Sequence, residues 1–236
     1  MTTFSITNLG WVLPAGIGTG AEILTNSELL DWVPEDNAAL AEFSAKPYLS
    51  SVKGYLDPAG AYCLAACALA LGEHEAGAKR DFSGIATVTR HGAAKSARKF
   101  HELLTSKGPR FASPLVFPHG YANTAGNLAA IEFGFGGPHL VLQGRQDVRE
   151  AIEFALVRLE NGEATEMLVA AYEATDEVSL PDGMATQNGA IALRLAAGEG
   201  LLGLDRDRLW AVPAPDLETG AVTALLALLQ GLASPA

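Results

Sequence analysis

The chain has 236 residues, of which 49% are hydrophobic and 18% charged, and its formal net charge is −11. This length suffices for one large domain with a buried core, and the negative charge argues against nonspecific nucleic-acid binding. The longest apolar run, residues 61–71, is shorter than the ~20 residues that span a bilayer, and the N-terminus lacks the basic start of a signal peptide. We therefore expect a cytoplasmic protein that makes no contact with a membrane.

The first third of the chain predicts one strand followed by irregular structure. Residues 4–8 alternate apolar and polar side chains, as a half-buried strand does, and a Gly/Pro-rich turn follows at 14–20. Prolines interrupt residues 22–58, which favours short helices and loops.

A buried helix is predicted next. Asp57 is placed to cap it, Pro58 suits its first position, and it should continue to about His74. The segment is apolar on nearly every side, so we expect it between layers. Its thiols, Cys63 and Cys67, stand one turn apart and are interpreted as small buried side chains, because neither a metal-binding nor a disulfide spacing is present.

The rest of the chain alternates strands with helices. We predict strands at 82–89, 139–143, 166–172 and 190–195, helices at 94–106, 147–160 and 221–232, and a loop-rich connection at 108–138. Helices of ten to fifteen residues between strands imply right-handed crossovers. We therefore expect a single α/β domain over residues 1–236, with a mixed, mostly parallel sheet of βαβαβαββ type and helices on both faces.

Half of the sixteen basic residues lie between positions 79 and 110. Two interpretations stay open: a solvated helix face, or a landing patch for an acidic partner or a phosphate-bearing carrier. The residues assigned to this basic patch are Lys95, Arg98, Lys99, Lys107 and Arg110.

Residues 108–138, GPRFASPLVFPHGYANTAGNLAAIEFGFGGP, resemble the β-ketoacyl synthases of the thiolase superfamily, which show GPR, SP, P, N, G, G and GP in this order. MLVAAYE at 167–173 resembles the family's MLAGGAE, residues 183–190 resemble its GEGA segment, and residues 4–20 resemble its opening strand and turn. The resemblance covers most of residues 1–197 and implies the N-terminal half of a thiolase-like fold, without the second half.

The resemblance also shows what is missing. The family's nucleophilic cysteine would align with Gln146 or Arg145, and neither side chain can form the thioester that condensation needs. The family's second half supplies two catalytic histidines, and this chain ends soon after its first half. We expect a pseudoenzyme without activity of its own, and neither a cofactor nor a metal.

Glutamine at the nucleophile position resembles chain length factors, which pair with an active ketosynthase in fatty-acid, polyketide or polyene biosynthesis and help to shape its acyl tunnel. The resemblance implies an active ketosynthase as partner, with an acyl carrier protein as a further contact. Ordinary core packing is the alternative role for the aromatic candidates. The tunnel or interface candidates are His91, Leu115, Val116, Phe117, Tyr121, Asn123, Phe133 and Phe135.

The strand at 139–143 is short and apolar, and in the resembling family it pairs with its counterpart in a second subunit. We therefore expect a dimer, either with a ketosynthase or with a second copy, and we expect a lone half to leave one helix layer uncovered. The alternative function is a homodimeric module that binds acyl groups or CoA through the basic patch. The residues of this edge strand are His139, Leu140, Val141, Leu142 and Gln143.

Overall fold

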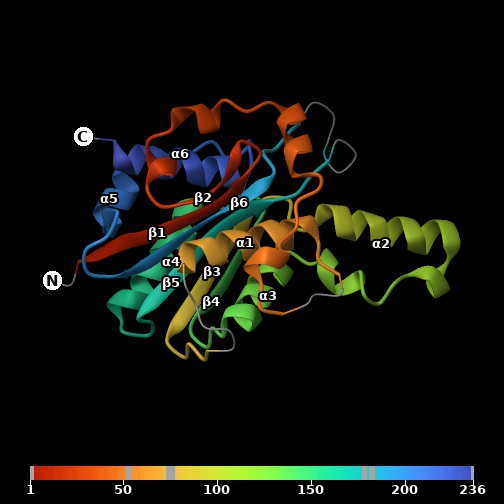
Figure 1. The fold of residues 1–236 in the computed structure, drawn as a ribbon, viewed down its shortest axis with the longest axis horizontal. Coiled ribbons are helices and arrows are strands. Elements are labelled where there is room, and N and C mark those ends of the chain that lie inside the picture. The colour runs from red at the N-terminus through yellow and green to blue at the C-terminus, as the bar shows by residue number, and fades with distance from the viewer. Residues whose placement is uncertain (1–2, 52–54, 73–77, 177–179, 181–183, 235–236) are drawn as a thin grey trace.

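The computed structural model describes residues 3–51, 55–72, 78–176, 180 and 184–234. Within them a seven-stranded sheet has the order β2-β1-β6-β5-β3-β4, with β7 paired to β1 (Figure 1). Residues 73–77, where the first helix was predicted to end, and Gly183 lie outside this description. The strands are β1 (Phe4–Leu13), β2 (Gly16–Thr19), β3 (Ser83–Thr89), β4 (His139–Gln143), β5 (Glu166–Glu173), β6 (Gly189–Ala197) and β7 (Leu202–Leu204).

The sheet is mixed, as the sequence predicts. β3 pairs in parallel with β4 and with β5, whereas β6 pairs antiparallel with β5 and β1. Parallel pairing involves fewer strands than the helix spacing predicted, because no helix is described between β5 and β6 and the chain turns back beside β5.

Helices cover both faces of the sheet. α1 and α3 pack on one face, and α4 and α6 pack on the other. Six short 3₁₀ helices lie in the connections that the structure describes. The helices are α1 (Pro58–Leu71), α2 (Ala94–Lys107), α3 (Thr124–Phe133), α4 (Val148–Glu160), α5 (Arg206–Ala211) and α6 (Ala221–Ala233), with η1 (Glu22–Leu24), η2 (Ser27–Leu30), η3 (Pro34–Leu40), η4 (Lys46–Tyr48), η5 (Pro109–Phe111) and η6 (Phe117–Gly120).

The first helix begins as predicted. The Asp57 carboxylate accepts the Ala59 N–H at 2.8 Å, and α1 ends at Leu71, before Gly72, whose φ of +70° disfavours other residues. The helix lies very close to β1, because a Cβ on Gly10 would stand 2.4 Å from the Ala66 carbonyl oxygen. Glycine is therefore required on β1 to seat this helix.

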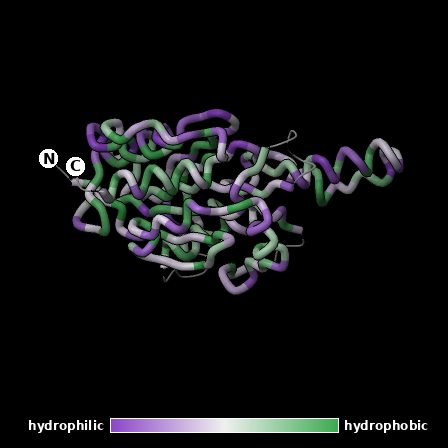
Figure 2. Tube along the Cα trace, turned by 90° about the horizontal axis from the view of Figure 1, so that it is seen from above, coloured by the Kyte–Doolittle hydropathy of each residue, from purple (hydrophilic) through white to green (hydrophobic). Residues whose placement is uncertain are grey.

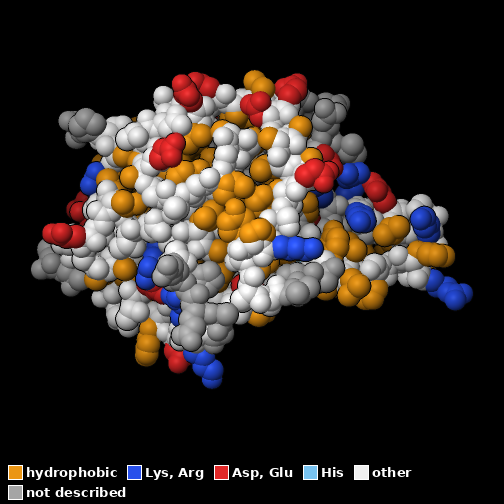
Figure 3. Space-filling view, in the orientation of Figure 1, with side chains coloured by type: hydrophobic (Ala, Val, Ile, Leu, Met, Phe, Trp, Pro, Cys, Tyr) orange, Lys and Arg blue, Asp and Glu red, His pale blue; other side chains and the backbone are white. Residues whose placement is uncertain are grey.

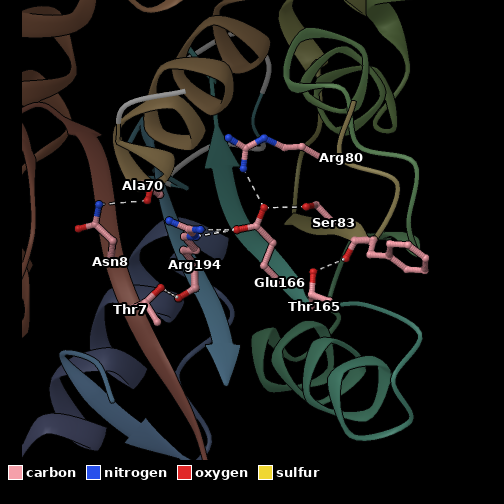
Figure 4. Close-up of polar contacts among 9 residues, drawn as sticks. Thr7, Asn8, Ala70, Arg80, Ser83, Thr165, Glu166 and Arg194 are labelled. Atoms are coloured by element: carbon pink, nitrogen blue, oxygen red, sulfur yellow. Dashed lines mark hydrogen bonds and ion pairs between the residues drawn. The ribbon is translucent and has the colours of Figure 1, made fainter. Parts of the chain in front are cut away.

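The amino end of β5 is fixed by a buried ion network (Figure 4). The Glu166 carboxylate accepts hydrogen bonds from Arg80 at 2.8 Å and Arg194 at 2.7 Å, and from the Ser83 hydroxyl. Burial would raise the pKa of Glu166, but Ser83 and the two arginines outweigh it and hold the pKa below its ordinary value. This network joins β3, β5 and β6.

The expectation of an uncovered helix layer is wrong. α6 packs beside α4 on the sheet, and its Leu225, Leu226 and Leu229 are completely buried. η1 and η2 contact α6, and the Gln230 side chain donates to the carbonyls of Ile23 and Asn26. The chain therefore covers this face with its own C-terminal helix.

Two helices and two strands were not predicted, and one of these strands, β2, lies within the turn expected at 14–20. α3 falls inside the expected loop at 108–138, where alanine and glycine give little helical amphipathicity. α5 and β7 are short and follow the last predicted strand. None of the described helices is long and apolar enough to cross a membrane.

Candidate functional site

The link between β4 and α4 is where the sequence placed the missing nucleophile. β4 ends at Gln143, and Arg145 and Gln146 then lie exposed on the surface. Asp147 caps α4 by accepting the Arg149 N–H at 2.9 Å, and the two side chains form an ion pair at 2.6 Å. The helix start therefore presents a carboxamide, a guanidinium and a carboxylate.

Arg145 is turned toward the segment that precedes α6. Its guanidinium lies 3.1 Å from Glu218, and the Arg90 guanidinium lies 2.5 Å from the same carboxylate. Arg90 also donates to the Leu217 carbonyl oxygen at 2.6 Å. The loop before α4 and the end of β3 are thereby tied to the C-terminal segment.

The two thiols lie elsewhere. Cys63 and Cys67 are completely buried in α1, on the opposite face of the sheet from α4. Their mutual hydrogen bond, and then burial, hold the pKa of Cys67 well above its ordinary value. A thiol held protonated in a core is not a nucleophile, so the interpretation of both as core residues is consistent with the structure.

Glu173, at the carboxyl end of β5, is a buried acid whose role the sequence did not reveal. It accepts N–H groups from Arg90 at 2.6 Å, from His91 at 3.2 Å and from Ala221 at 3.2 Å. Burial outweighs these bonds and raises the pKa of Glu173 to about 7. The carboxyl group thus joins the ends of β3 and β5 to the start of α6.

His91 lies beside this junction, half-buried, and its Nε2 has no hydrogen-bond partner among the described residues. Burial, and then the charge of Arg90, lower the pKa of the His91 imidazole. Glu173 contacts the backbone N–H of His91 and not its imidazole ring. The position of His91 near an acyl tunnel therefore stays a prediction.

α2, η5 and η6 form an arm that projects from one end of the body (Figures 1 and 2). At its base the Ser96 hydroxyl donates to Asp57 at 2.5 Å and lies 2.8 Å from the Tyr55 hydroxyl. Further along, Arg98 pairs with Asp176 at 2.9 Å. Asp57 therefore serves the starts of both α1 and α2.

A small cavity lies where the arm meets the body. It is lined by Asp57, His119, Tyr121 and Tyr172, among others, and its ~10 Å³ leaves room for about one water molecule. Burial raises the pKa of Asp57 and lowers that of His119. A cavity of this size does not accommodate an acyl chain.

The structure separates the predicted tunnel or interface residues into two groups. Phe117 and Tyr121 are exposed on the arm with their rings 5.2 Å apart, and Leu115 beside them is 69% exposed. The second group, Val116, Phe133 and Phe135, lies in or against the core, so the alternative of core packing fits these three, whereas Asn123 belongs to neither group. Core residues are Val116 and Phe133, Phe135 is partly buried against Phe133, and Asn123 is exposed before α3.

β4 is an edge strand. It pairs with β3 on one side, and none of the described residues pairs with its other side. His139 and Gln143 are exposed, and the three residues between them are partly buried. The predicted bounds of this strand are confirmed, and the strand offers free backbone groups for pairing.

The basic patch lies on the arm, as basic side chains in Figure 3 show. Arg98 is held by Glu102 at 2.7 Å and by Asp176. Lys99 stands over the Tyr55 ring at 5.6 Å. No group of three or more His, Cys, Asp or Glu side chains within the described ranges could hold a metal ion.

Comparison with solved structures decides the fold. The ishigamide ketosynthase/chain length factor superposes with a TM-score of 0.64 at 20% identity, over 91% of this chain and 64% of that one. This chain has the ketosynthase fold. The complex of AntDE with its acyl carrier protein AntF gives 0.61 at 15% identity, over 91% and 65% of the two chains.

A third match covers less of this chain. The complex of the ketosynthase ApeO with its chain length factor ApeC from Xenorhabdus doucetiae gives a TM-score of 0.52 at 18% identity, over 85% of this chain and 81% of that one. The chain spans less than two thirds of the first two matched proteins. No family model and no curated protein matches the sequence.

Proposed function

We propose that this chain is a noncatalytic, chain-length-factor-like subunit that pairs with an active β-ketoacyl synthase in polyketide, polyene or fatty-acid biosynthesis. The observation that carries the proposal is the start of α4, where Arg145 and Gln146 occupy the exposed link and Asp147 caps the helix. Condensation in ketosynthases requires a thiolate at a helix start, and a carboxamide or guanidinium cannot form the thioester.

The free edge of β4 and the exposed arm support a partner. An unpaired strand edge that is neither covered nor charged is a site for pairing with another chain. Two of the matched structures are complexes, of a ketosynthase with its chain length factor and of a ketosynthase with an acyl carrier protein. We propose a ketosynthase as the dimer partner and a carrier protein as a further contact.

In this proposal Phe117 and Tyr121 line the acyl tunnel or its interface. Both rings are exposed in the isolated chain, where large apolar side chains would otherwise be in water. A ring that fills the end of a tunnel excludes further methylene groups, so its removal lengthens the product.

Coexpression with an active ketosynthase and its carrier protein tests the proposal. We expect the two chains to copurify, and Phe117→Ala to change product chain length. Phe82→Ala is the matched control, because Phe82 is also exposed but comes directly before β3, whereas the arm follows the other end of that strand.

Two results would contradict the proposal. Covalent acylation of the isolated chain followed by elongation would make it a catalyst. Tight binding of CoA esters by the isolated chain, without copurification or a change in product, would favour the stand-alone acyl- or CoA-binding module.

A further inference from the structure

The segment that forms the arm and β4 has the opposite charge from the rest of the sequence. Residues 95–146 carry six basic and two acidic side chains, a net charge of +4, whereas the remaining residues carry ten basic and twenty-five acidic ones, a net charge of −15. We call the exposed surface of α2, η5, η6, α3 and β4 the arm–edge face. Acidic side chains line the opposite, upper rim in Figure 3.

Both acids of this segment are already engaged. Glu102 pairs with Arg98, and Glu132 accepts hydrogen bonds from the backbone and hydroxyl groups of Ser50 and Ser51. Four basic side chains have no ion-pair partner within the described part of the chain. They are Lys95, Lys99, Lys107 and Arg110.

The same segment also exposes many large apolar side chains. Six of the eleven large hydrophobic side chains exposed in the described residues lie on this segment, although it is less than a quarter of the chain. Exposed apolar groups gathered on one face mark an interaction site. The six are Leu104, Phe111, Leu115, Phe117, Tyr121 and Ile131.

These elements form one continuous surface. η5 and η6 contact α2, and α3 contacts η6. At the other end α3 reaches β4, because a Cβ on Gly126 would stand 3.1 Å from the His139 Nε2 atom. The elements that carry these exposed apolar and basic side chains are therefore in contact with one another from the arm to the edge strand.

We propose that the arm–edge face selects a partner protein of different sequence, whose matching surface is apolar with an acidic rim, and that it disfavours a second copy of this chain. A two-fold dimer presents the same patch twice, so a homodimer through this face would place basic rim against basic rim. Like charges across an interface weaken it, and opposite charges strengthen it and speed association. The inference rests on the proposed function and names the chemistry of its partner.

A charge-reversed copy of the chain can stand in for the partner. The variant Lys99→Glu/Lys107→Glu/Arg110→Glu keeps the apolar side chains and the β4 edge, and changes the net charge of residues 95–146 from +4 to −2. Sedimentation velocity at ~0.05 M salt, where screening is weak, compares wild type, variant and an equimolar mixture. Circular dichroism verifies that the variant is folded.

We expect the wild type to associate weakly, and the mixture to form dimers at least about tenfold more tightly than the wild type alone. At ~0.5 M salt this difference should shrink severalfold, because the Debye length falls to a few ångströms. The control Lys46→Glu/Lys79→Glu/Arg206→Glu makes the same charge change at residues outside this segment, and should give no gain on mixing.

Equal affinity of the wild-type homodimer and the mixed dimer, or absence of any mixed species, would overturn the inference. The two proposals fail separately. A tight wild-type homodimer from a chain that still changes a ketosynthase's product would contradict the charge selection alone. Mixed dimers from a chain without effect on any ketosynthase would contradict the proposed function alone.

Discussion

The two sides of this molecule differ in how completely their apolar side chains are buried. On the side of α4, the chain buries its apolar helices with its own C-terminal helix and with η1 and η2. On the side of the arm and β4, large apolar side chains and a strand edge stay exposed among the described residues. The first side should therefore determine the stability of the isolated chain, and the second its association.

The covered side is held by polar contacts as well as by burial. Glu173 and Arg90 tie the strand ends to residues 217–221, and Arg149 donates to the Val212 carbonyl at 3.0 Å while lying over the Trp210 ring. These contacts place the C-terminal segment against the start of α4. The described residues therefore form this core among themselves.

The largest expected effect is on the covered side. Leu225→Ala should lower the free energy of unfolding by about 2–5 kcal/mol, because it removes a completely buried side chain and leaves a cavity between α6 and the sheet. Urea denaturation followed by circular dichroism measures the change. A loss below about 1 kcal/mol would mean that α6 does not complete the core.

The next effect, of about 3 kcal/mol, concerns the pH dependence of stability. The pKa of Glu173 is about 7 in the folded chain and has an ordinary value of 4.5, so the folded state holds its proton more tightly than the unfolded state. Stability should therefore fall as pH rises from about 4.5 to about 7 and then level off. Chemical denaturation at a series of pH values measures this slope.

Two variants test whether Glu173 causes this fall of stability with pH. Glu173→Gln should flatten the fall in stability between these pH values, whatever its effect on stability itself. Glu166→Gln is the control at the other end of β5. The lowered pKa of Glu166 stabilises the fold above its unfolded pKa and is lost as pH falls, so this variant should leave the neutral side of the profile unchanged. A slope that persists in Glu173→Gln would contradict the assignment.

Local patterns in the sequence predicted much of the fold. The bounds of β4, the cap of α1 at Asp57 and the start of α4 at Asp147 depend on neighbouring residues, and each is seen in the structure. α3 was missed because its alanines and Gly126 fit closely against other elements instead of forming an amphipathic stripe. The packing of α6 beside α4 on the sheet depends on contacts between distant segments, which the periodicity of the sequence does not reveal.

The candidate site, like the fold, was predicted from the sequence only in part. The absence of a thiol between β4 and α4 follows from the sequence alone, and the structure adds that Arg145 and Gln146 are exposed there. The role of Glu173 could not be predicted, because its donors come from the end of β3 and the start of α6. The MLVAAYE segment placed Glu173 in the family pattern but did not predict that its side chain is buried.

The smallest expected effect on stability is on the open side, at Leu115. Leu115→Ala removes a side chain that is 69% exposed, so the free energy of unfolding should change by no more than about 0.5 kcal/mol. The same change should weaken association, because apolar surface that a partner would bury is lost. Urea denaturation of the isolated chain and sedimentation of the mixed dimer measure the two quantities separately. A large loss of stability without loss of association would show that Leu115 packs within its own chain, and the contrast between the two sides would then fail.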